Sequence, residues 1–274
     1  MKVNVDGIGF NVLLHPSDFT KSKTPIIFLH GFTGSCIDWK FILDKFPQEY
    51  YPVAIDLIGH GESDSPEDPK YYSCSSIVYQ LHSITKKLGF DKFLLAGYSM
   101  GGRAALSFTL RHQSKVTALI MESTTAGIED ICDQKQRVQF DLLLADKIKD
   151  EGIEAFTDFW FNTPLFRSLR NHIDFENEKN KRNKNSVMGL ANSLSGFSTG
   201  LMPNYWDRIH TIKVPVLLIS GEFDEKYTKL NAEMNSLIST SKHITVEGTG
   251  HNTHLEKPEL FTKFVLDFLN TIER

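Results

Sequence analysis

Cysteine is scarce in this sequence, and its few cysteines follow no pattern that would bind a metal or build a disulfide framework. Cys36, Cys74 and Cys132 are odd in number, lie far apart, and form no C-x-x-C pair. Such use of cysteine is typical of a reducing compartment. We therefore expect neither a metal site nor structural disulfides.

Long hydrophobic runs and an excess of either charge are also missing. No apolar stretch approaches the roughly 20 residues of a membrane span, and residues 1–7 lack the apolar core of a secretory signal peptide. The 30 Lys and Arg residues nearly balance the 34 Asp and Glu residues, so nothing suggests nucleic acid or an anionic membrane surface as a partner. We expect a cytoplasmic protein that is not inserted into a membrane.

The stretch 93–103 carries the strongest signal. An apolar run of strand length, 93–98, leads into the sequence Gly-x-Ser-x-Gly at 97–101, and a helical pattern follows at once. This order predicts a nucleophile elbow, a sharp strand-to-helix turn with Ser99 at its strained tip. The serine Oγ would stand over the start of a helix, where N–H groups favour a developing negative charge. An ordinary strand-to-helix turn that contains a serine is the alternative.

Short apolar runs alternate with helical patterns on both sides of this stretch. After an expected β-hairpin at 3–15, the runs expected to be buried strands are 25–30, 51–56, 93–98, 116–121, 214–221 and 244–246. Helices are expected from a cap at Ser73 or Ser75 to Gly89, and at about 100–112, 226–239 and 258–269. The alternation predicts an α/β fold with a mostly parallel central sheet and helices on both faces.

The pattern changes between about 125 and 207. This segment has no short β-branched runs and looks helical, polar and rich in Asp, Lys and Arg, including the charged run 174–185. In the middle of an α/β pattern it predicts an inserted helical lid. We expect the lid at 125–205 and the core at 1–124 and 206–274.

A serine nucleophile needs a base, and the base needs an acid that orients it. Where a nucleophile elbow carries the serine, the acid and then the histidine follow it along the chain. Asp224 follows the expected strand 214–221, and glycine-flanked His251 follows the expected strand 244–246. Loops at the carboxyl edge of a parallel sheet converge on one crevice, so we expect Ser99, Asp224 and His251 to meet there. The rival candidates are the acids Glu122, Glu222 and Glu225 and the base His254.

Two backbone N–H groups are expected to form an oxyanion hole beside the serine. One belongs to Met100, the residue after the nucleophile, and the other to the loop 30–32, with Phe32 as the best candidate. His30 and His60 lie in this loop and a neighbouring one. We expect them to brace these loops by hydrogen bonds rather than to carry protons in catalysis.

Motifs along nearly the whole chain carry a more specific resemblance. They are the elbow Gly97-Tyr98-Ser99-Met100-Gly101-Gly102-Arg103, the stretch 122–128 and, in the expected lid, Gln136-Arg137, Phe159-Trp160, 164–166 and 198–206. Together they resemble the MenH family of 2-succinyl-6-hydroxy-2,4-cyclohexadiene-1-carboxylate synthases, a branch of the α/β-hydrolase superfamily. One loop departs from the expected pattern, because Ile58 stands where Asp-x-Pro-Gly-His-Gly usually has proline.

This resemblance implies a lyase rather than a hydrolase. Members of the family remove pyruvate from 2-succinyl-5-enolpyruvyl-6-hydroxy-3-cyclohexene-1-carboxylate in menaquinone biosynthesis, and they need no metal or cofactor. By analogy, Ser99, activated by His251 and oriented by Asp224, would abstract a proton without forming an acyl-enzyme. The oxyanion hole would hold the charge that develops on the succinyl keto oxygen.

The resemblance also implies residues that bind this small-molecule substrate, which carries three carboxylates. Planar arginine side chains bind carboxylates bidentately. Arg103 lies one helical turn after the nucleophile, and Arg137 and Arg182 stand where the family carries lid arginines. Tyr98 would flank the nucleophile, and Trp160 would form a wall of the lid. The alternatives are a surface salt bridge for Arg103, a solvated charged face for Arg182 and packing alone for Trp160.

Two other functions fit the same elbow. A serine esterase or carbon–carbon bond hydrolase would use the triad with an acyl-enzyme or an activated water, and an α/β-hydrolase scaffold could also act as a non-catalytic ligand receptor. Arginines that face the pocket would favour the lyase, whereas apolar walls would favour an esterase for neutral esters. We expect a monomer, with a homodimer as the alternative.

Overall fold

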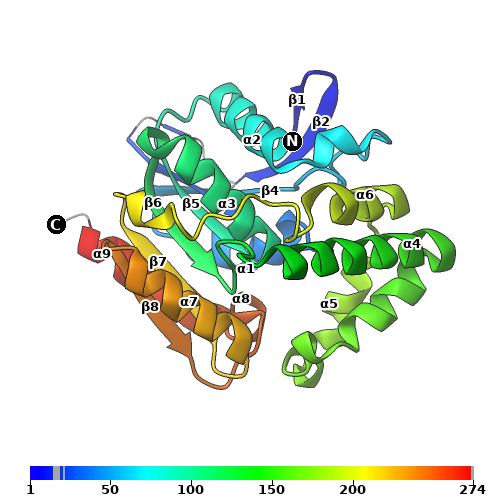
Figure 1. The fold of residues 1–274 in the computed structure, drawn as a ribbon. Helices are drawn as coiled ribbons and strands as arrows, with labels where there is room; N and C mark the ends of the chain where they lie inside the picture. Colours follow the sequence, from blue (N-terminus) through cyan, green and yellow to red (C-terminus); the bar gives the residue numbers. More distant parts are fainter. Residues whose placement is uncertain (15–18, 21, 273–274) are drawn as a thin grey trace.

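A central eight-stranded sheet organises the protein. The computed structural model describes residues 1–14, 19–20 and 22–272, and the strand order is β1-β2-β4-β3-β5-β6-β7-β8 (Figure 1). The bounds are β1 (Lys2–Val5), β2 (Ile8–Leu14), β3 (Thr24–Leu29), β4 (Tyr50–Ile55), β5 (Phe93–Tyr98), β6 (Val116–Glu122), β7 (Val216–Gly221) and β8 (Ser241–Val246). Strands β3 to β8 pair with one another in parallel, whereas β2 pairs antiparallel with both β1 and β4. The predicted mostly parallel sheet is therefore confirmed.

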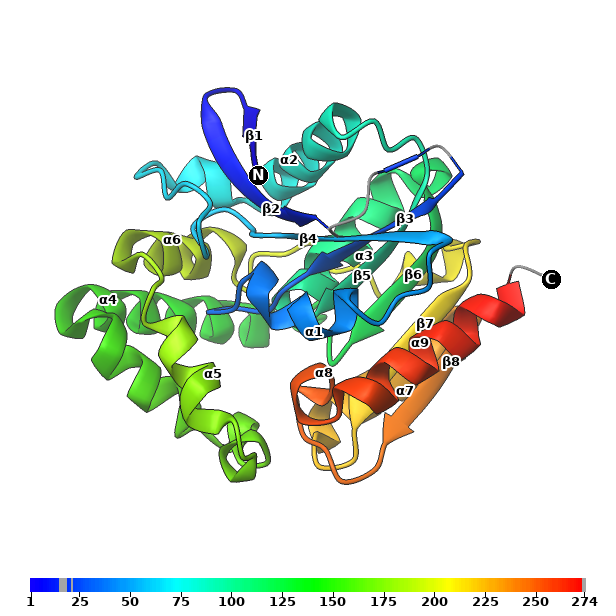
Figure 2. The ribbon, with the colours of Figure 1, turned by 180° about the vertical axis from the view of Figure 1, so that it is seen from behind.

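Helices cover both faces of the sheet. Figure 1 shows α2 (Cys74–Lys87), α3 (Met100–Arg111) and α7 (Glu225–Leu237) on one face, and Figure 2 shows α1 (Lys40–Leu43) and α9 (Pro258–Ile272) on the other. Each layer has its own buried apolar cluster, so β4, β5 and β7 are buried at every residue. Burial on both faces explains why these strands are unbroken apolar runs rather than alternating ones.

The first two strands form the predicted hairpin. Asp6 and Gly7 form its turn with positive φ values of 50° and 87°, the conformation that tight hairpin turns require. The last residue of the predicted hairpin, at position 15, lies outside the described residues. Ser73 caps α2 by accepting the N–H of Ser76 at 3.2 Å, and this settles the choice between the two predicted capping serines.

The segment predicted to form a lid, 125–205, is described throughout and contains no strand. It holds α4 (Ile131–Phe161), α5 (Phe175–Arg182) and α6 (Val187–Phe197), with short 3₁₀ turns at 164–166 and 169–171. Gly152, with φ 80°, breaks the helical geometry inside α4. Figures 1 and 2 show these helices beside the sheet, next to the carboxyl ends of its strands.

The lid helices have an apolar core of their own. Leu144, Ile148 and Phe156 of α4 pack against Leu190 and Leu194 of α6. Phe32 and Trp160, both partly buried, pack at the border of this cluster, and Phe32 comes from the loop after β3. The lid therefore meets the sheet through the loop that was expected to supply an oxyanion-hole N–H group.

Among the described residues, no helix has the length and apolar character needed to span a membrane. The last two residues of the predicted core segment, 273–274, lie outside the described part of the chain.

Candidate active site

The turn between β5 and α3 has the geometry of a nucleophile elbow. Ser99 holds φ 50° and ψ −107°, a strained conformation for a residue with a side chain. A Cβ on Gly97 would collide with the carbonyl of Gly101, and a Cβ on Gly101 would collide with the carbonyl of Leu29. The two glycines therefore allow the close approach that holds the serine at the tip. The Ser99 N–H donates to the Glu122 carbonyl at 2.9 Å and ties the turn to the end of β6.

The structure brings Ser99, His251 and Asp224 together. His251 Nε2 lies 3.1 Å from Ser99 Oγ, and His251 Nδ1 lies 2.7 Å from Asp224 Oδ2. A carboxylate only accepts hydrogen bonds, so Nδ1 carries the proton and Nε2 is free to accept from the serine hydroxyl. Both ionisable side chains are buried, because they follow β7 and β8 into the crevice at the carboxyl edge of the sheet.

The rival acids and base occupy other positions. Glu122 Oε1 accepts from Thr253 Oγ1 at 2.6 Å and from the His254 N–H at 3.1 Å. His254 Nδ1 lies 2.8 Å from Glu122 Oε2 without hydrogen-bond alignment, and the imidazole stacks on Trp39. Glu122 and His254 thus form a second buried pair, one that ties the loop carrying His251 to the end of β6.

Glu222 and Glu225 also lie away from the serine. Glu222 accepts the N–H of Gly248 at 2.8 Å, and both glutamates line a separate surface cavity beside the lid. Among the candidate acids and bases predicted from sequence, only His251 hydrogen-bonds to the serine, and only Asp224 hydrogen-bonds to His251.

The two predicted bracing histidines hydrogen-bond to loop backbone. His30 Nδ1 donates to the Gly31 carbonyl at 2.7 Å, and its Nε2 accepts the Leu57 N–H at 2.9 Å. His60 Nδ1 donates to the Ile58 carbonyl at 3.0 Å. Burial lowers the pKa of both imidazoles, and that of His60 falls to about 3. Both are therefore neutral at physiological pH, as bracing groups rather than proton carriers should be.

A cavity of about 240 Å³ lies between the elbow and the lid. Six of the residues predicted for catalysis or binding line it: Phe32, Ser99, Met100, Arg103, Arg137 and Trp160. The indole Nε1 of Trp160 is buried and has no hydrogen-bond partner among the described residues. Such an unpaired buried donor is unusual in a folded protein, and here it belongs to a residue of the cavity wall.

Arg103 is buried under the cavity rather than exposed on a helix surface. Its Nη1 donates to the Phe197 carbonyl at 2.8 Å, and its guanidinium carbon lies 4.5 Å from the centre of the Phe197 ring. No carboxylate pairs with it among the described side chains. Burial, reinforced by nearby Arg137, lowers the pKa of Arg103 to about 10. A buried arginine without a counter-charge is well placed to bind an anionic ligand.

Arg137 faces the same cavity from α4. Its Nε donates to both carboxylate oxygens of Asp141 at 2.9 Å. Asp141 also accepts from Ser198 Oγ at 2.6 Å. The terminal nitrogens of Arg137 have no acceptor among the described residues, and the side chain remains 30% exposed. The aspartate thus orients the guanidinium and leaves its outer edge open to a ligand.

Arg182 and Tyr98 depart from the expectation of substrate contact, because the structure does not bring them to this cavity. Arg182 is buried in an ion pair with Asp38. Burial alone would raise the pKa of Asp38, but Arg182 outweighs burial and lowers it. Tyr98 is buried between the rings of His251 and His254, at 5.2 and 4.7 Å. Arg182 thus already has an ion partner, and Tyr98 packs against the catalytic histidine instead of lining this cavity.

Sequence reasoning missed two residues of α7 that line the cavity. They are Lys226 and Tyr227, two and three residues after Asp224 in the first turn of the helix. A signal for them was present, since residues next to the acid of a triad must lie close to the same crevice.

Comparisons with known proteins agree with this geometry. A family model described as "alpha/beta hydrolase fold" matches residues 24–258. A protein of Bacillus subtilis (strain 168), named "Putative 2-succinyl-6-hydroxy-2,4-cyclohexadiene-1-carboxylate synthase", is 42% identical over 97% of each chain. The solved structure of MenH from S. aureus superimposes with a TM-score of 0.90 and 32% identity, over 97% of this chain and 99% of that one.

An esterase from Thermogutta terrifontis superimposes with a TM-score of 0.85 over the full length of both chains, but at only 22% identity. That likeness shows the shared fold alone.

Proposed function

Because the chain belongs to the α/β hydrolase fold family and, within it, to the 2-succinyl-6-hydroxy-2,4-cyclohexadiene-1-carboxylate synthases, we propose that it works as that lyase. It eliminates pyruvate from 2-succinyl-5-enolpyruvyl-6-hydroxy-3-cyclohexene-1-carboxylate in menaquinone biosynthesis. The observation that carries this conclusion is the match to the Bacillus synthase along nearly the whole length of both chains.

The triad acts as the general base in this proposal. His251, oriented by Asp224, accepts the proton of Ser99 while Ser99 Oγ takes a proton from the ring carbon beside the succinyl ketone. The electron pair of the broken C–H bond moves into the ring, the existing double bond shifts, and the C–O bond to the enolpyruvyl group breaks. Pyruvate leaves as its enolate and takes up a proton, so that atoms and charge balance.

Negative charge reaches the succinyl keto oxygen during proton removal. The N–H groups of Met100 and Phe32 would hold it, since both residues line the cavity beside Ser99. Met100 is the first residue of α3. Its N–H group supports this role, because the first N–H groups of a helix have no partner within the helix.

The cations of the cavity favour the lyase over the runner-up, a serine esterase or carbon–carbon bond hydrolase. Arg103 and Arg137 both line the wall, and a substrate with three carboxylates offers them partners. A neutral ester would leave the buried charge of Arg103 unpaired, at a cost in free energy. We place the enzyme in the cytoplasm and expect a monomer that needs no cofactor.

A direct assay tests this function. The purified protein would receive the succinylated enolpyruvyl cyclohexene carboxylate, generated enzymatically in the same vessel, while pyruvate release is followed. The same preparation would be offered p-nitrophenyl acetate. Fast pyruvate release with negligible ester cleavage is the expected result. Ester cleavage without pyruvate release would replace the lyase by the hydrolase.

A further inference from the structure

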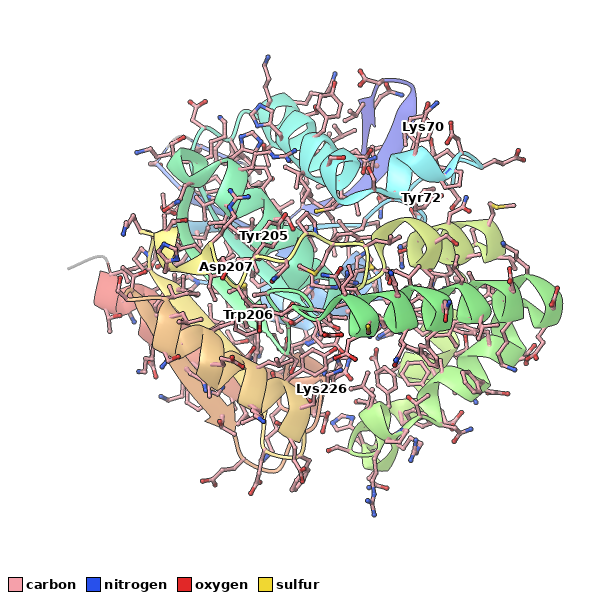
Figure 3. All side chains as sticks on the ribbon, in the orientation of Figure 1. Lys70, Tyr72, Tyr205, Trp206, Asp207 and Lys226 are labelled. Carbon is pink, nitrogen blue, oxygen red and sulfur yellow. The ribbon has the colours of Figure 1, made fainter. Side chains whose placement is uncertain are left out.

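Lys226 stands at the mouth of the catalytic cavity. It lies in the first turn of α7, two residues after Asp224. It lines the inner cavity of about 240 Å³ and also a second, outer cavity of about 790 Å³, whose walls share Arg137 and Tyr227 with the first. Figure 3 labels Lys226 between α7 and the lid helices. Lys226 is thus one of the residues at which the two cavities adjoin.

The ammonium group of Lys226 lies 5.6 Å from the centre of the Tyr227 ring. It forms no ion pair with any described side chain, and the nearby carboxylate of Asp224 is already bonded to His251. The side chain of Lys226 is exposed, but partial desolvation on its cavity side and the neighbouring Arg137 lower its pKa, while Asp224 opposes them. The first turn of a helix also disfavours a positive charge. An anion bound beside Lys226 would offset these effects.

The substrate needs one more cation than the two cavity arginines provide. It carries three carboxylates, and Arg103 and Arg137 line the inner cavity. Arg182 is not available, because Asp38 holds it in a buried pair. Among the described residues that line the inner cavity, Lys226 is the remaining cation.

The geometry of the reaction decides which carboxylate reaches the mouth. The carbon that loses its proton must lie against Ser99, and the carbon that carries the enolpyruvyl group is across the ring from it. The leaving group consequently points away from the elbow. Lys226 lies on that outer side, where the inner cavity meets the outer one.

We propose that Lys226 binds the carboxylate of the enolpyruvyl group and holds it at the cavity mouth until it departs as pyruvate, an assignment that rests on the proposed lyase function. A lysine suits this task better than an arginine. Its ammonium is a compact, hydrated point charge without the fixed two-point geometry of a guanidinium, so it can follow the leaving group as the C–O bond breaks.

The test compares Lys226→Met, Lys226→Arg and a control, Lys229→Met, which removes an exposed lysine from the same helix. Each variant is assayed with the tricarboxylate substrate. Each is also assayed with 2-(3-carboxypropanoyl)benzoate as competitive inhibitor, which keeps the ring and succinyl carboxylates but lacks the enolpyruvyl group. Lys226→Met should lower kcat/KM by roughly 10- to 50-fold, as expected for loss of a charge-assisted contact.

The other measurements locate the missing contact. Lys226→Arg should recover most of the loss, Lys229→Met should match the wild type, and the inhibition constant of the dicarboxylate should stay within about twofold in all variants. An unchanged kcat/KM in Lys226→Met would overturn the proposal. So would an inhibition constant that rises as much as kcat/KM falls, because Lys226 would then bind a different carboxylate.

The outcome for the wild type separates this inference from the proposed function. A wild-type enzyme that releases no pyruvate would remove the lyase itself. A wild-type enzyme that releases pyruvate, with a Lys226→Met variant equally active, would remove only the role of Lys226.

Discussion

The crevice at the sheet edge and the underside of the lid contribute to one cavity by different means. In the crevice, Ser99, Asp224 and His251 each follow the carboxyl end of a parallel strand, and the sheet places all three ends at the same edge. In the lid, the position of Arg137 and Arg182 depends on how three helices pack on one another and on the core. The crevice is fixed by connectivity, whereas the lid is fixed by packing.

The two lid arginines show what this difference means. Arg137 lies on the cavity wall, and the Asp141 pair leaves its outer nitrogens open. Arg182 lies in a helix of the same lid, yet its guanidinium is buried against Asp38 of the core. The outer nitrogens of Arg137 remain open on the cavity wall, whereas Arg182 ties α5 to Asp38. Both residues are arginines of the segment 125–205, so their different environments come from tertiary contacts alone.

The largest effect should come from the crevice. Ser99→Ala removes the group that takes the substrate proton, and pyruvate release should fall by at least about 10³-fold. Its melting temperature should stay close to that of the wild type, because the backbone of the elbow is held by Gly97, Gly101 and the Glu122 carbonyl. Steady-state assays and thermal melts measure both quantities. Turnover like that of the wild type would end the assignment of Ser99.

The lid arginines should give opposite results when each is changed to methionine. Arg182→Met leaves the Asp38 carboxylate buried without its partner and should cost about 3–5 kcal/mol of unfolding free energy. Arg137→Met also leaves a buried carboxylate, but Asp141 keeps its hydrogen bond from Ser198 and Arg137 itself is 30% exposed, so this change should cost less stability and mainly raise KM. Denaturant titration and steady-state kinetics on both variants measure the contrast.

A double variant controls for the buried charge. Arg182→Met combined with Asp38→Asn removes both charges of the pair, and it should recover part of the lost stability. If Arg182→Met instead raised KM and left stability unchanged, Arg182 would reach the substrate after all, and the division between the two arginines would fail.

The sequence predicts the crevice well because its signals are local. The elbow motif, an acid after one strand and a histidine after the next are each visible within a few residues, and a parallel sheet brings such loops together whatever the details of packing. The strained φ of Ser99 and the two close-packed glycines follow from the same motif. The mostly parallel sheet is predicted for the same reason, from apolar runs of strand length.

The lid is predictable only as a helical segment. Its charged run 174–185 resembles a solvated helix face, yet Arg182 within it is buried, because Asp38 lies 144 positions earlier in the chain and no local pattern connects them. The predicted substrate contact of Tyr98 is not seen for a related reason. The side chain before the nucleophile packs against the His251 ring and does not line the cavity. Lys226 was missed although it lies beside the acid of the triad.

Glu122 connects the nucleophile turn to the loop that carries His251. Its backbone carbonyl accepts the Ser99 N–H, while its carboxylate holds the loop of His251 through Thr253 and the His254 N–H. Glu122→Ala should therefore lower kcat by roughly tenfold to 50-fold with little change in KM, because the base is displaced while the binding residues stay in place. Glu122→Gln keeps the acceptor oxygen and should recover most of this loss. Equal effects on KM and kcat would leave Glu122 with a structural role only.

The smallest expected effect is a change in the unfolding free energy at acid pH. It arises at the seam between crevice and lid, which we define as the contact of the loop 56–63 with Asn185. The loop that carries His60 reaches the lid, because the Gly61 N–H donates to Asn185 Oδ1 at 3.0 Å. Burial lowers the pKa of His60 to about 3 in the folded protein, against about 6.5 in an unfolded chain. Below about pH 6.5, the His60 imidazole binds a proton in the unfolded state but not in the folded state. The contribution of His60 to stability is therefore complete above about pH 6.5 and is lost as the pH falls.

His60 should therefore cost the protein about 0.7 kcal/mol of unfolding free energy between pH 7 and pH 6, and about 1.4 kcal/mol for each further unit. His60→Asn can still donate to the Ile58 carbonyl but cannot titrate. The slope of its unfolding free energy against pH should therefore be smaller than that of the wild type by the contribution of one proton. His30 keeps part of the slope, since burial lowers its pKa as well. Changing the exposed His210 to Asn is the control, and denaturant titrations from pH 7 to pH 5 give the slopes. A slope for His60→Asn equal to that of the wild type would show that the seam between crevice and lid is not where acid acts.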